Sequence, residues 1–257
     1  MILTDSHTHL YLKQFNGDRY EVIRNAINQD VRYMILPNID KDSINPMMDI
    51  IRDFPGNCFP MMGLHPTSVG QDYLIHLEVV KEWLKKEKFY AIGEMGIDLY
   101  WDKTYFIEQQ EAFRVQVSLA LEFDLPIVIH ARNSFDEIFH LLQEVYQPGL
   151  RGVFHCFTGT LAQADHIINL GFLLGIGGVI TYKNPSLAEV VEKVSLTSLL
   201  LETDAPFLAP TPYRGKRNES AYILEIANKL AEIQGRTVEE VAEITTQNAI
   251  KMFKIGS

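Results

Sequence analysis

The sequence is poor in cysteine, with only Cys58 and Cys156 among its 257 residues. Two cysteines are too few for a disulfide framework, and both lie in apolar stretches, so we expect buried, reduced thiols. No apolar run approaches the roughly 18 residues that predict a transmembrane helix. The N-terminal segment MILTDSHTHL also lacks the basic and apolar regions of a secretory signal. We therefore expect a soluble, cytoplasmic protein with no membrane partner.

Basic residues are scarce relative to acidic ones. The chain has 23 Lys and Arg against 33 Asp and Glu, which gives a formal net charge of −10. This balance argues against a broad basic face that binds polyanions indiscriminately, so any nucleic acid has to be held locally. An apolar fraction of 47%, with no Gly/Ser linker or charge block, is typical of one globular domain, which we place over residues 1–257.

Eight short apolar runs recur at fairly even intervals along the chain. They are continuously apolar, as parallel strands buried on both faces require, and segments with helical spacing separate them. The pattern predicts an α/β fold, a (β/α)8 TIM barrel, with a doubly wound open sheet as the alternative because periodicity alone does not prove closure. The expected strands are Ile2–Thr4, Arg32–Leu36, Cys58–Met62, Phe89–Ile92, Ile127–Ile129, Gly152–Phe154, Phe172–Ile176 and Leu199–Leu201.

Capping residues predict where several helices begin and end. Ser134 and Thr237 are each followed by Glu three residues later, the spacing of a capping box at a helix N-terminus. Another helix is expected to start near Asn218 and to stop at Gly235. The glycine-rich GIGG at 175–178 lacks the spacing of a dinucleotide-binding loop, so we expect it to end a strand where the backbone needs room.

Polar and ionisable residues follow most of the expected strands. In a barrel the carboxyl ends of the strands meet at one mouth, so these residues converge from distant parts of the sequence. Several are of types that bind divalent metals, and burying such groups side by side without a cation is costly. They are His7, His9, Asn38, His65, Glu94, His130, His155, Glu202 and Asp204.

Two metal-binding groups can be assembled from these side chains. His7 and His9 are two residues apart, so both imidazoles can point to the same side of an extended strand. Glu94 has two carboxylate oxygens and is the candidate bridge between two ions. One ion would be bound by His7, His9, Glu94 and Asp204, and the other by Glu94, His130 and His155. The alternatives are partly exposed loop histidines for the HxH pair and core histidines for the other two.

Asp204 has a further candidate role as general base, because a carboxylate beside a bound water can accept its proton. The alternative is that Asp204 caps the segment that follows it. The nitrogen-rich site suits Zn, Mn, Co or Ni, while the carboxylates also accept Mg when phosphate is bound. The cofactors expected are therefore two divalent metal ions of one of these elements.

Together these motifs resemble the TatD-type metal-dependent hydrolases, commonly described as TatD deoxyribonucleases, within the amidohydrolase barrel superfamily. The resemblance runs through DSHTHL, GLHP, IGEMGID, EQQEAFRVQVSLA, LPIVIHAR, GVFHCFTG, LLLETDAPFL, PYRGKRNES and TTQNAIKMF. Ser220 departs from the family pattern, which often has proline there, but it lies outside the ligand set. The resemblance implies a barrel with a divalent-metal centre formed by His7, His9, Glu94, His130, His155 and Asp204.

Candidate substrate contacts lie near the same mouth. Arg132 could grip a phosphate through its guanidinium or form a salt bridge at the rim. His65 is assigned to contact with a substrate oxygen or to proton transfer, with a purely structural histidine as the alternative. Arg214, Lys216 and Arg217 form a compact basic run that could hold a phosphodiester backbone, or else be solvated and paired with neighbouring acid.

The function expected is that of a metal-dependent hydrolase with Asp204 as general base and Glu94 as bridging ligand. The resemblance implies phosphodiester bonds of DNA as its target, cleaved from a chain end. One alternative is an ester hydrolase acting on D-aminoacyl-tRNA, and another is a noncatalytic barrel that binds metal or nucleic acid as a scaffold. No obligate protein partner can be inferred from the sequence.

Overall fold

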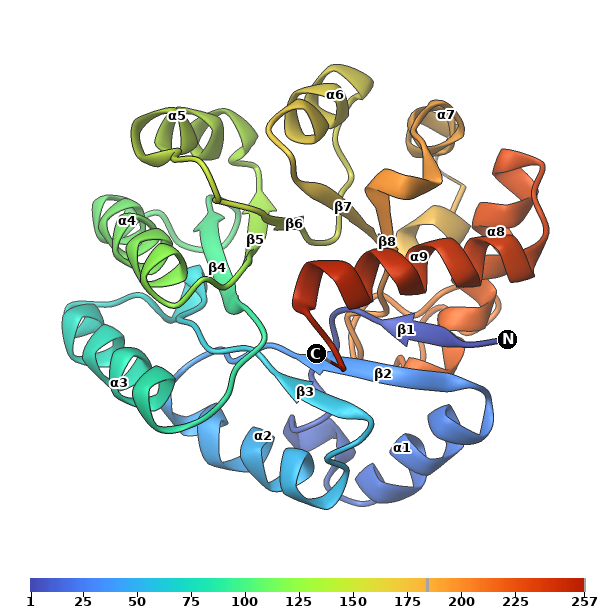
Figure 1. The fold of residues 1–257 in the computed structure, drawn as a ribbon, viewed down its shortest axis with the longest axis horizontal. Helices are drawn as coiled ribbons and strands as arrows, with labels where there is room; N and C mark the ends of the chain where they lie inside the picture. Colours follow the sequence, from blue (N-terminus) through green and yellow to red (C-terminus); the bar gives the residue numbers. More distant parts are fainter. Residues whose placement is uncertain (184, 257) are drawn as a thin grey trace.

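The structure, a computed structural model, describes residues 1–183 and 185–256. Within these residues, parallel strands alternate with helices along the chain, and the helices α1 to α8 form a ring around the strands (Figure 1). The strands are β1 (Leu3–Asp5), β2 (Val31–Leu36), β3 (Cys58–Pro60), β4 (Ile92–Asp98), β5 (Ile127–Arg132), β6 (Gly152–Phe154), β7 (Leu173–Ile176) and β8 (Leu199–Leu201). The α-helices are α1 (Arg19–Asn28), α2 (Lys41–Asp53), α3 (Tyr73–Lys86), α4 (Phe106–Glu122), α5 (Phe135–Val145), α6 (Leu161–Asn169), α7 (Pro185–Lys193), α8 (Ile223–Gln234) and α9 (Val238–Phe253). Short 3₁₀ helices are η1 (Lys13–Phe15), η2 (Pro66–Ser68), η3 (Gly178–Thr181), η4 (Leu196–Ser198) and η5 (Ser220–Tyr222).

The strands form two sheets, β1-β2-β3 and β4-β5-β6-β7-β8, which meet at two seams. At one seam the Gly93 amide donates to the Met62 carbonyl at 3.0 Å. At the other seam the Ser6 amide donates to the Leu201 carbonyl, also at 3.0 Å. Because backbone hydrogen bonds cross both seams, the ring of strands closes. The predicted (β/α)8 barrel is therefore confirmed, and the open sheet is not what the chain forms.

Most expected strands lie within a residue or two of the observed ones, but β5 runs three residues further, to Arg132, and β4 differs more. The apolar pattern predicts a strand over Phe89–Ile92, whereas β4 runs from Ile92 to Asp98. Its ladder with β5 continues through Gly96, which pairs with His130. Backbone pairing with the neighbouring strand β5 thus extends β4 through polar residues that the apolar pattern excludes.

The capping predictions have mixed outcomes. Thr237 forms the expected capping box, and Gly235 ends α8 in the left-handed conformation with a φ of 61°. The box expected at Ser134 is wrong, because its hydroxyl donates to the Ile97 carbonyl of β4 at 2.7 Å and does not cap α5. The helix expected to start near Asn218 begins later, at η5 and α8. The Asn218 side-chain amide donates to the Thr203 carbonyl at 2.7 Å, which ties Asn218 to the loop before η5.

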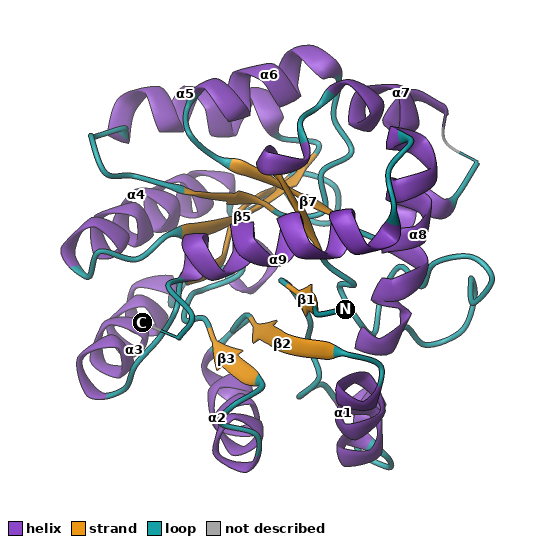
Figure 2. Ribbon diagram, turned by 45° about the vertical axis from the view of Figure 1, so that its right-hand side comes forward, coloured by secondary structure: helices purple, strands orange, loops and turns teal. Residues whose placement is uncertain are grey.

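The barrel interior is apolar at the end where the strands begin, and α9 lies across the strands there (Figure 2). Phe253 of α9 is only 2% exposed and packs in this interior cluster. Other members of the cluster come from the strands and from α9: Ile35, Phe59, Met61, Ala91, Val128, Val153, Leu200, Ala249, Met252 and Ile255. Helix α9 therefore closes one end of the barrel and leaves the carboxyl ends of the strands as the mouth.

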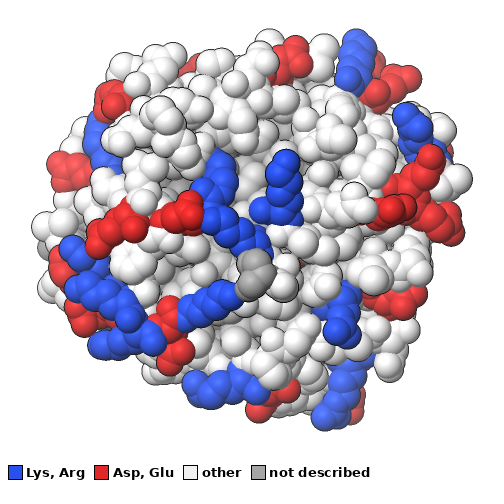
Figure 3. All heavy atoms as spheres, in the orientation of Figure 1, with Lys and Arg blue, Asp and Glu red and all other residues white. Residues whose placement is uncertain are grey.

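The cysteines, the apolar content of the helices and the surface charge bear on the expectations from composition. Cys58 and Cys156 are both free thiols, but only Cys58 is fully buried. None of the helices in the described part of the chain is long and apolar enough to cross a membrane. On the face that carries α9, Lys and Arg gather near the centre and mix with Asp and Glu around the rim (Figure 3). Charges of both signs therefore share this face.

Candidate metal centre

All six predicted ligands come together at the carboxyl ends of the strands. Every pair of ligand atoms within each of three overlapping groups lies within 4.8 Å, and two of these groups contain only predicted ligands. The six side chains come from the segment after β1, from β4 and β5, and from the segments after β6 and β8: His7, His9, Glu94, His130, His155 and Asp204. Residues more than 190 positions apart in the sequence thus share one site.

Glu94 lies between two sets of histidines. Its Oε2 atom is 3.1 Å from His7 Nε2 and 3.5 Å from His9 Nε2. Its Oε1 atom is 2.9 Å from His130 Nδ1 and 3.2 Å from His155 Nε2. Glu94 is only 2% exposed, so both oxygens depend on these partners. The carboxylate therefore faces one set with each oxygen, as a bridging ligand would.

Asp204 joins the set that contains the HxH pair. Its Oδ1 atom lies 3.4 Å from His9 Nε2 and 4.0 Å from His7 Nε2. The residue has a positive φ of 57°, in the left-handed region that Asp tolerates better than most residues. Among the described residues no helix begins until η5 at Ser220, so Asp204 does not act as the N-cap that was its alternative role.

Hydrogen bonds on the outer side of the cluster orient His9, the second histidine of the HxH pair. The Tyr11 hydroxyl donates to the Pro37 carbonyl at 2.6 Å, so its oxygen accepts from His9 Nδ1 at 2.9 Å. The proton of the neutral ring is thereby placed on Nδ1, and the Nε2 lone pair points to Glu94 and Asp204. Tyr11 thus fixes the tautomer that a metal ligand needs.

Two carboxylates orient the other set in the same way. His155 donates from Nδ1 to Glu202 Oε1 at 3.0 Å, which leaves its Nε2 lone pair toward Glu94. His130 donates from Nε2 to Asp98 Oδ2 at 2.9 Å, which leaves its Nδ1 lone pair toward Glu94. Histidine ligands of metals usually donate their other ring N–H to a carboxylate or carbonyl in this manner.

The donor set fits divalent metal ions. An imidazole lone pair and a carboxylate oxygen about 3 Å apart repel each other unless a proton or a metal ion lies between them. Burial lowers the pKa of His9, but hydrogen bonds to Asp204 and Glu94 outweigh burial and raise it to about 9. Burial also acts on His155, yet Glu202 and Glu94 raise its pKa well above the usual value. Protons thus occupy positions that a cation could take.

The carboxylates of the cluster are ionised at neutral pH. Burial raises the pKa of Glu94, but the surrounding histidines, His65 and His155 above all, lower it well below its usual value. Burial likewise raises the pKa of Asp204, and its hydrogen bond to His9 outweighs that effect and lowers it. Both groups are therefore available as anionic ligands, and Asp204 is available as a proton acceptor.

Comparison with known proteins places this site in a family. A sequence model described as TatD related DNase matches residues 4–254. The chain belongs to this TatD family. A Bacillus subtilis relative named YabD, an uncharacterized metal-dependent hydrolase, is 38% identical over 99% of this chain and 100% of its own length. The relative YcfH from Escherichia coli K12, named in the same way, is 31% identical over 100% of this chain and 97% of its own.

Solved structures of the TatD family have the same fold. The crystal structure of YjjV, a TatD homologue from Escherichia coli K12, has a TM-score of 0.92 and 29% identity, covering 98% of both chains. A TatD family hydrolase from Entamoeba histolytica has a TM-score of 0.86 at 22% identity, again covering 98% of both chains, which shows likeness of fold alone. This TatD family chain is accordingly a metal-dependent hydrolase.

A cavity of about 660 Å³ opens over the cluster and contains His65. The His65 Nδ1 atom accepts from the Thr67 amide at 3.1 Å at the start of η2. The ring proton therefore lies on Nε2, which is 3.3 Å from Glu94 Oε1. His65 thus combines the structural role that was its alternative with a donor N–H at the cluster.

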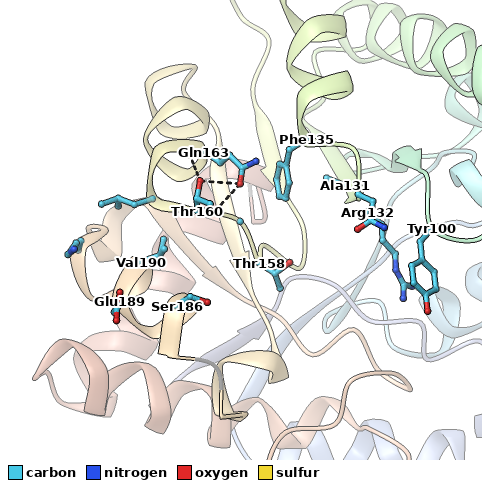
Figure 4. Close-up of a pocket in the computed structure, with 14 residues that line it drawn as sticks. Tyr100, Ala131, Arg132, Phe135, Thr158, Thr160, Gln163, Ser186, Glu189 and Val190 are labelled. Atoms are coloured by element: carbon cyan, nitrogen blue, oxygen red, sulfur yellow. Dashed lines mark hydrogen bonds between the residues drawn. The ribbon is translucent and has the colours of Figure 1, made fainter.

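Arg132 also lines this cavity, and its side chain is exposed. Its guanidinium stacks on the ring of Tyr100, 4.0 Å from the ring centre, and lies 5.3 Å from the ring centre of Trp101. Figure 4 shows the Arg132 side chain running beside Tyr100. The interaction seen is therefore cation–π stacking, which leaves the edge of the guanidinium available to an anion.

The basic run after β8 is divided by the structure. Arg217 donates to both carboxylate oxygens of Asp18 at 2.7 Å and to Glu219 at 2.9 Å. Its guanidinium is used within the fold, as in the alternative of pairing with neighbouring acid, so a substrate-binding role does not fit it. Arg214 and Lys216 are exposed, and Arg214 stacks on Tyr182 at 4.5 Å. They lie outside the described lining of the cavity.

Sequence reasoning missed the roles of Tyr11, Asp98 and Glu202. A signal was present for Asp98, which follows Glu94 by four residues on the same strand, β4, where residues an even number apart point to the same side. Tyr11 lies in a turn after His9, and strand spacing does not indicate its role. The GIGG segment makes room for one of them, as expected. A Cβ atom at Gly175 would lie 2.1 Å from Glu202 Oε2, so only glycine fits there.

Proposed function

We propose that this TatD family hydrolase cleaves phosphodiester bonds of DNA and does so from a chain end. The observation that carries the proposal is the position of Glu94, with an oxygen toward each set of histidines, beneath a cavity that contains Asp204 and Arg132. A centre with two cations suits in-line displacement at phosphorus, because it stabilises both the attacking and the leaving oxygen.

The size of the cavity supports attack at a chain end. Its volume of about 660 Å³ falls in the range of about 300–1,000 Å³ found for pockets that enclose small ligands. Such a space holds a few nucleotides and excludes the full width of a duplex. A terminal phosphodiester therefore fits this cavity better than one in the middle of a long double strand.

The side chains of the cavity suit the steps of hydrolysis. His7, His9, Glu94, Asp204, His130 and His155 would hold two divalent cations, which when bound polarise a phosphoryl oxygen and make water easier to deprotonate. Asp204 accepts the proton of the attacking water, because its carboxylate is ionised and lies at the cavity wall. His65 donates its Nε2–H to a substrate oxygen, and Arg132 binds phosphate.

The net charge of −10 makes local phosphate contacts necessary. Arg132 supplies one inside the cavity. Arg214 and Lys216 supply exposed positive charge on the segment between β8 and η5, which also carries Asp204. These residues hold the strand that extends beyond the cavity, and this contact weakens with salt.

The test compares three substrates in parallel. Metal-reconstituted protein is incubated with end-labelled single-stranded DNA, double-stranded DNA and D-aminoacyl-tRNA, with Asp204→Asn as the control. Stepwise release of nucleotides from a DNA end is expected. Release of amino acid from the tRNA would instead identify the ester hydrolase, and bound metal with no turnover of any substrate would identify a scaffold.

A further inference from the structure

Two large exposed aromatic side chains are adjacent in the sequence, and one of them, Trp101, lines the cavity over the metal cluster. Tyr100 is 54% exposed and Trp101 is 68% exposed, on the loop that follows β4. Their rings pack edge to face, with centroids 4.9 Å apart and an interplanar angle of 88°. Single exposed apolar residues are common, but adjacent exposed aromatics beside a cavity are typical of a ligand-binding surface.

The loop is anchored to the metal centre through Asp98. Asp98 Oδ1 accepts from the backbone amides of Tyr100 at 2.9 Å and Trp101 at 3.1 Å, while Oδ2 accepts from His130. Burial raises the pKa of Asp98, but the bond from His130 and these amides outweigh burial and lower it to about 2. The same ionised carboxylate thus positions both a metal ligand and the aromatic pair.

Arg132 covers one face of Tyr100 and leaves Trp101 largely open. The guanidinium lies 4.0 Å from the Tyr100 ring centre and 5.3 Å from that of Trp101. Arg132 therefore occupies one face of the Tyr100 ring, and Trp101 packs against Tyr100 edge to face. Trp101 presents most of its ring to solvent, so it is the member of the group that can stack on a ligand.

The group separates two hollows. Trp101 and Arg132 line the cavity over the metal cluster, and Tyr100 and Arg132 line a neighbouring groove of about 720 Å³ (Figure 4). Phe207 and Leu208 line the metal cavity as well and are also exposed, at 45% and 40%. An apolar ring entering this mouth therefore meets aromatic and aliphatic side chains, while a charge beside it meets Arg132.

We propose that Trp101, held in place by Tyr100 and Arg132, stacks on an unpaired nucleobase of the strand whose phosphate lies at the metal centre. This inference rests on the proposed cleavage of phosphodiesters. Bases inside a duplex have both faces covered by their neighbours, so only an unpaired or terminal base can offer a face to Trp101. The platform gives the enzyme affinity for single-stranded ends that does not depend on its net charge.

A binding experiment tests the stacking without relying on turnover. The chain has two tryptophans, Trp83 and Trp101, so Trp83→Phe leaves Trp101 as the sole indole fluorophore. Metal-loaded Trp83→Phe protein is titrated with a phosphorothioate oligothymidylate, which resists hydrolysis, and with a strand of equal length and charge that carries abasic sites. Saturable quenching by the first strand and little by the second is expected. Equal quenching by both would overturn the proposal.

Substitutions separate stacking from a general loss of function. Trp101→Ala is expected to raise KM for single-stranded DNA by about tenfold to a hundredfold with little change in kcat, since stacking of a base is worth that much. Trp101→Phe is expected to restore most of the affinity. In Trp101→Ala, KM for an abasic strand is expected to stay unchanged. The matched control is Tyr146→Ala, an aromatic that is 42% exposed beyond the end of α5.

The outcomes of the two experiments are distinguishable. Equal losses on abasic and base-containing strands in Trp101→Ala, or a similar loss in Tyr146→Ala, would overturn the stacking role while leaving hydrolysis intact. Base-dependent quenching of Trp101 without hydrolysis of any strand would support the platform and overturn the proposed reaction instead.

Discussion

The two ends of the barrel differ in chemistry although the same strands build both. At the amino-terminal end the interior is filled by apolar side chains and closed by α9, whereas at the other end it is lined by histidines and carboxylates. The change takes a single step of two residues along a strand, about 6.6 Å. It is seen in the pairs Val128 and His130, Val153 and His155, and Leu200 and Glu202.

Stability and chemistry are thus supplied by adjacent layers of one interior. The apolar layer gains free energy by leaving water, while the polar layer is costly to bury until its charges are balanced. Changes in the first layer should therefore reduce stability, and changes in the second should reduce activity or metal binding.

The largest expected effect is on the closed end. Phe253→Ala should lower the free energy of unfolding by about 3–5 kcal/mol, because it leaves a cavity where a buried ring packs inside the barrel. Denaturant unfolding measures this loss, and kcat of the folded fraction should be unchanged. Lys251→Ala, an exposed change on the same helix, is the control. A stability loss as small as that of the control would contradict the conclusion that α9 closes this end of the barrel.

At the open end, Glu94→Gln should lower kcat about a thousandfold without lowering the melting temperature. The amide keeps the shape of the carboxylate but loses the negative charge that faces both sets of histidines. Turnover, melting temperature and metal content are measured on one sample, with the exposed Glu239→Gln as control. A metal content of one ion with full activity in the unaltered protein would contradict the bridging role.

The next effect concerns the proton acceptor. Asp204→Asn should lower kcat by about a hundredfold or more with little change in substrate affinity, since general-base catalysis contributes roughly 10²- to 10⁴-fold. Metal content has to be measured in parallel, because losing a ligand imitates losing a base. Near-normal turnover in the fully metallated variant would show that the proton goes elsewhere, with His65 the next candidate.

A smaller effect, on metal affinity, is expected from Tyr11, which contacts the candidate ligand His9. Tyr11→Phe removes the oxygen that accepts from His9 Nδ1, so the metal affinity should fall by about tenfold to a hundredfold. A competition titration with a chelator measures this change, and Tyr33→Phe is the control. Unchanged affinity would mean that the tautomer of His9 does not depend on Tyr11.

The smallest effect is the pH dependence of metal binding. The pKa of His9 is raised to about 9 in the absence of metal, so a cation must displace its proton at neutral pH. Metal affinity should therefore rise about tenfold per pH unit for each proton released, up to about pH 9. In metal-free protein the charged ring stabilises the fold fully below its ordinary pKa of 6.5, and this contribution is lost as pH rises through 9.

Calorimetry at pH 7 in buffers of different protonation enthalpy measures the protons released on metal binding. Release of fewer than one proton per chain would contradict the raised pKa. The loss of unfolding free energy caused by Phe253→Ala should show no matching dependence on pH, because Phe253 packs in a cluster of apolar side chains.

The local signals in the sequence had clear limits. The capping box at Thr237 formed as expected because both partners lie within a single turn. The box at Ser134 did not form, because the Ile97 carbonyl of a neighbouring strand accepted its hydroxyl. The pairing of Arg217 with Asp18 joins residues 199 positions apart, which no local pattern indicates.

The alternation of strands and helices and the six candidate ligands could be predicted from the sequence, because burial pattern and side-chain type follow the order of residues along the chain. Only the tertiary structure decided where the ring protons lie, which oxygen of Glu94 meets which histidine, and that Arg132 lies on Tyr100. These properties depend on atoms brought together from different strands. The direction of a hydrogen bond or a stacked ring exists only once those strands have closed into a barrel.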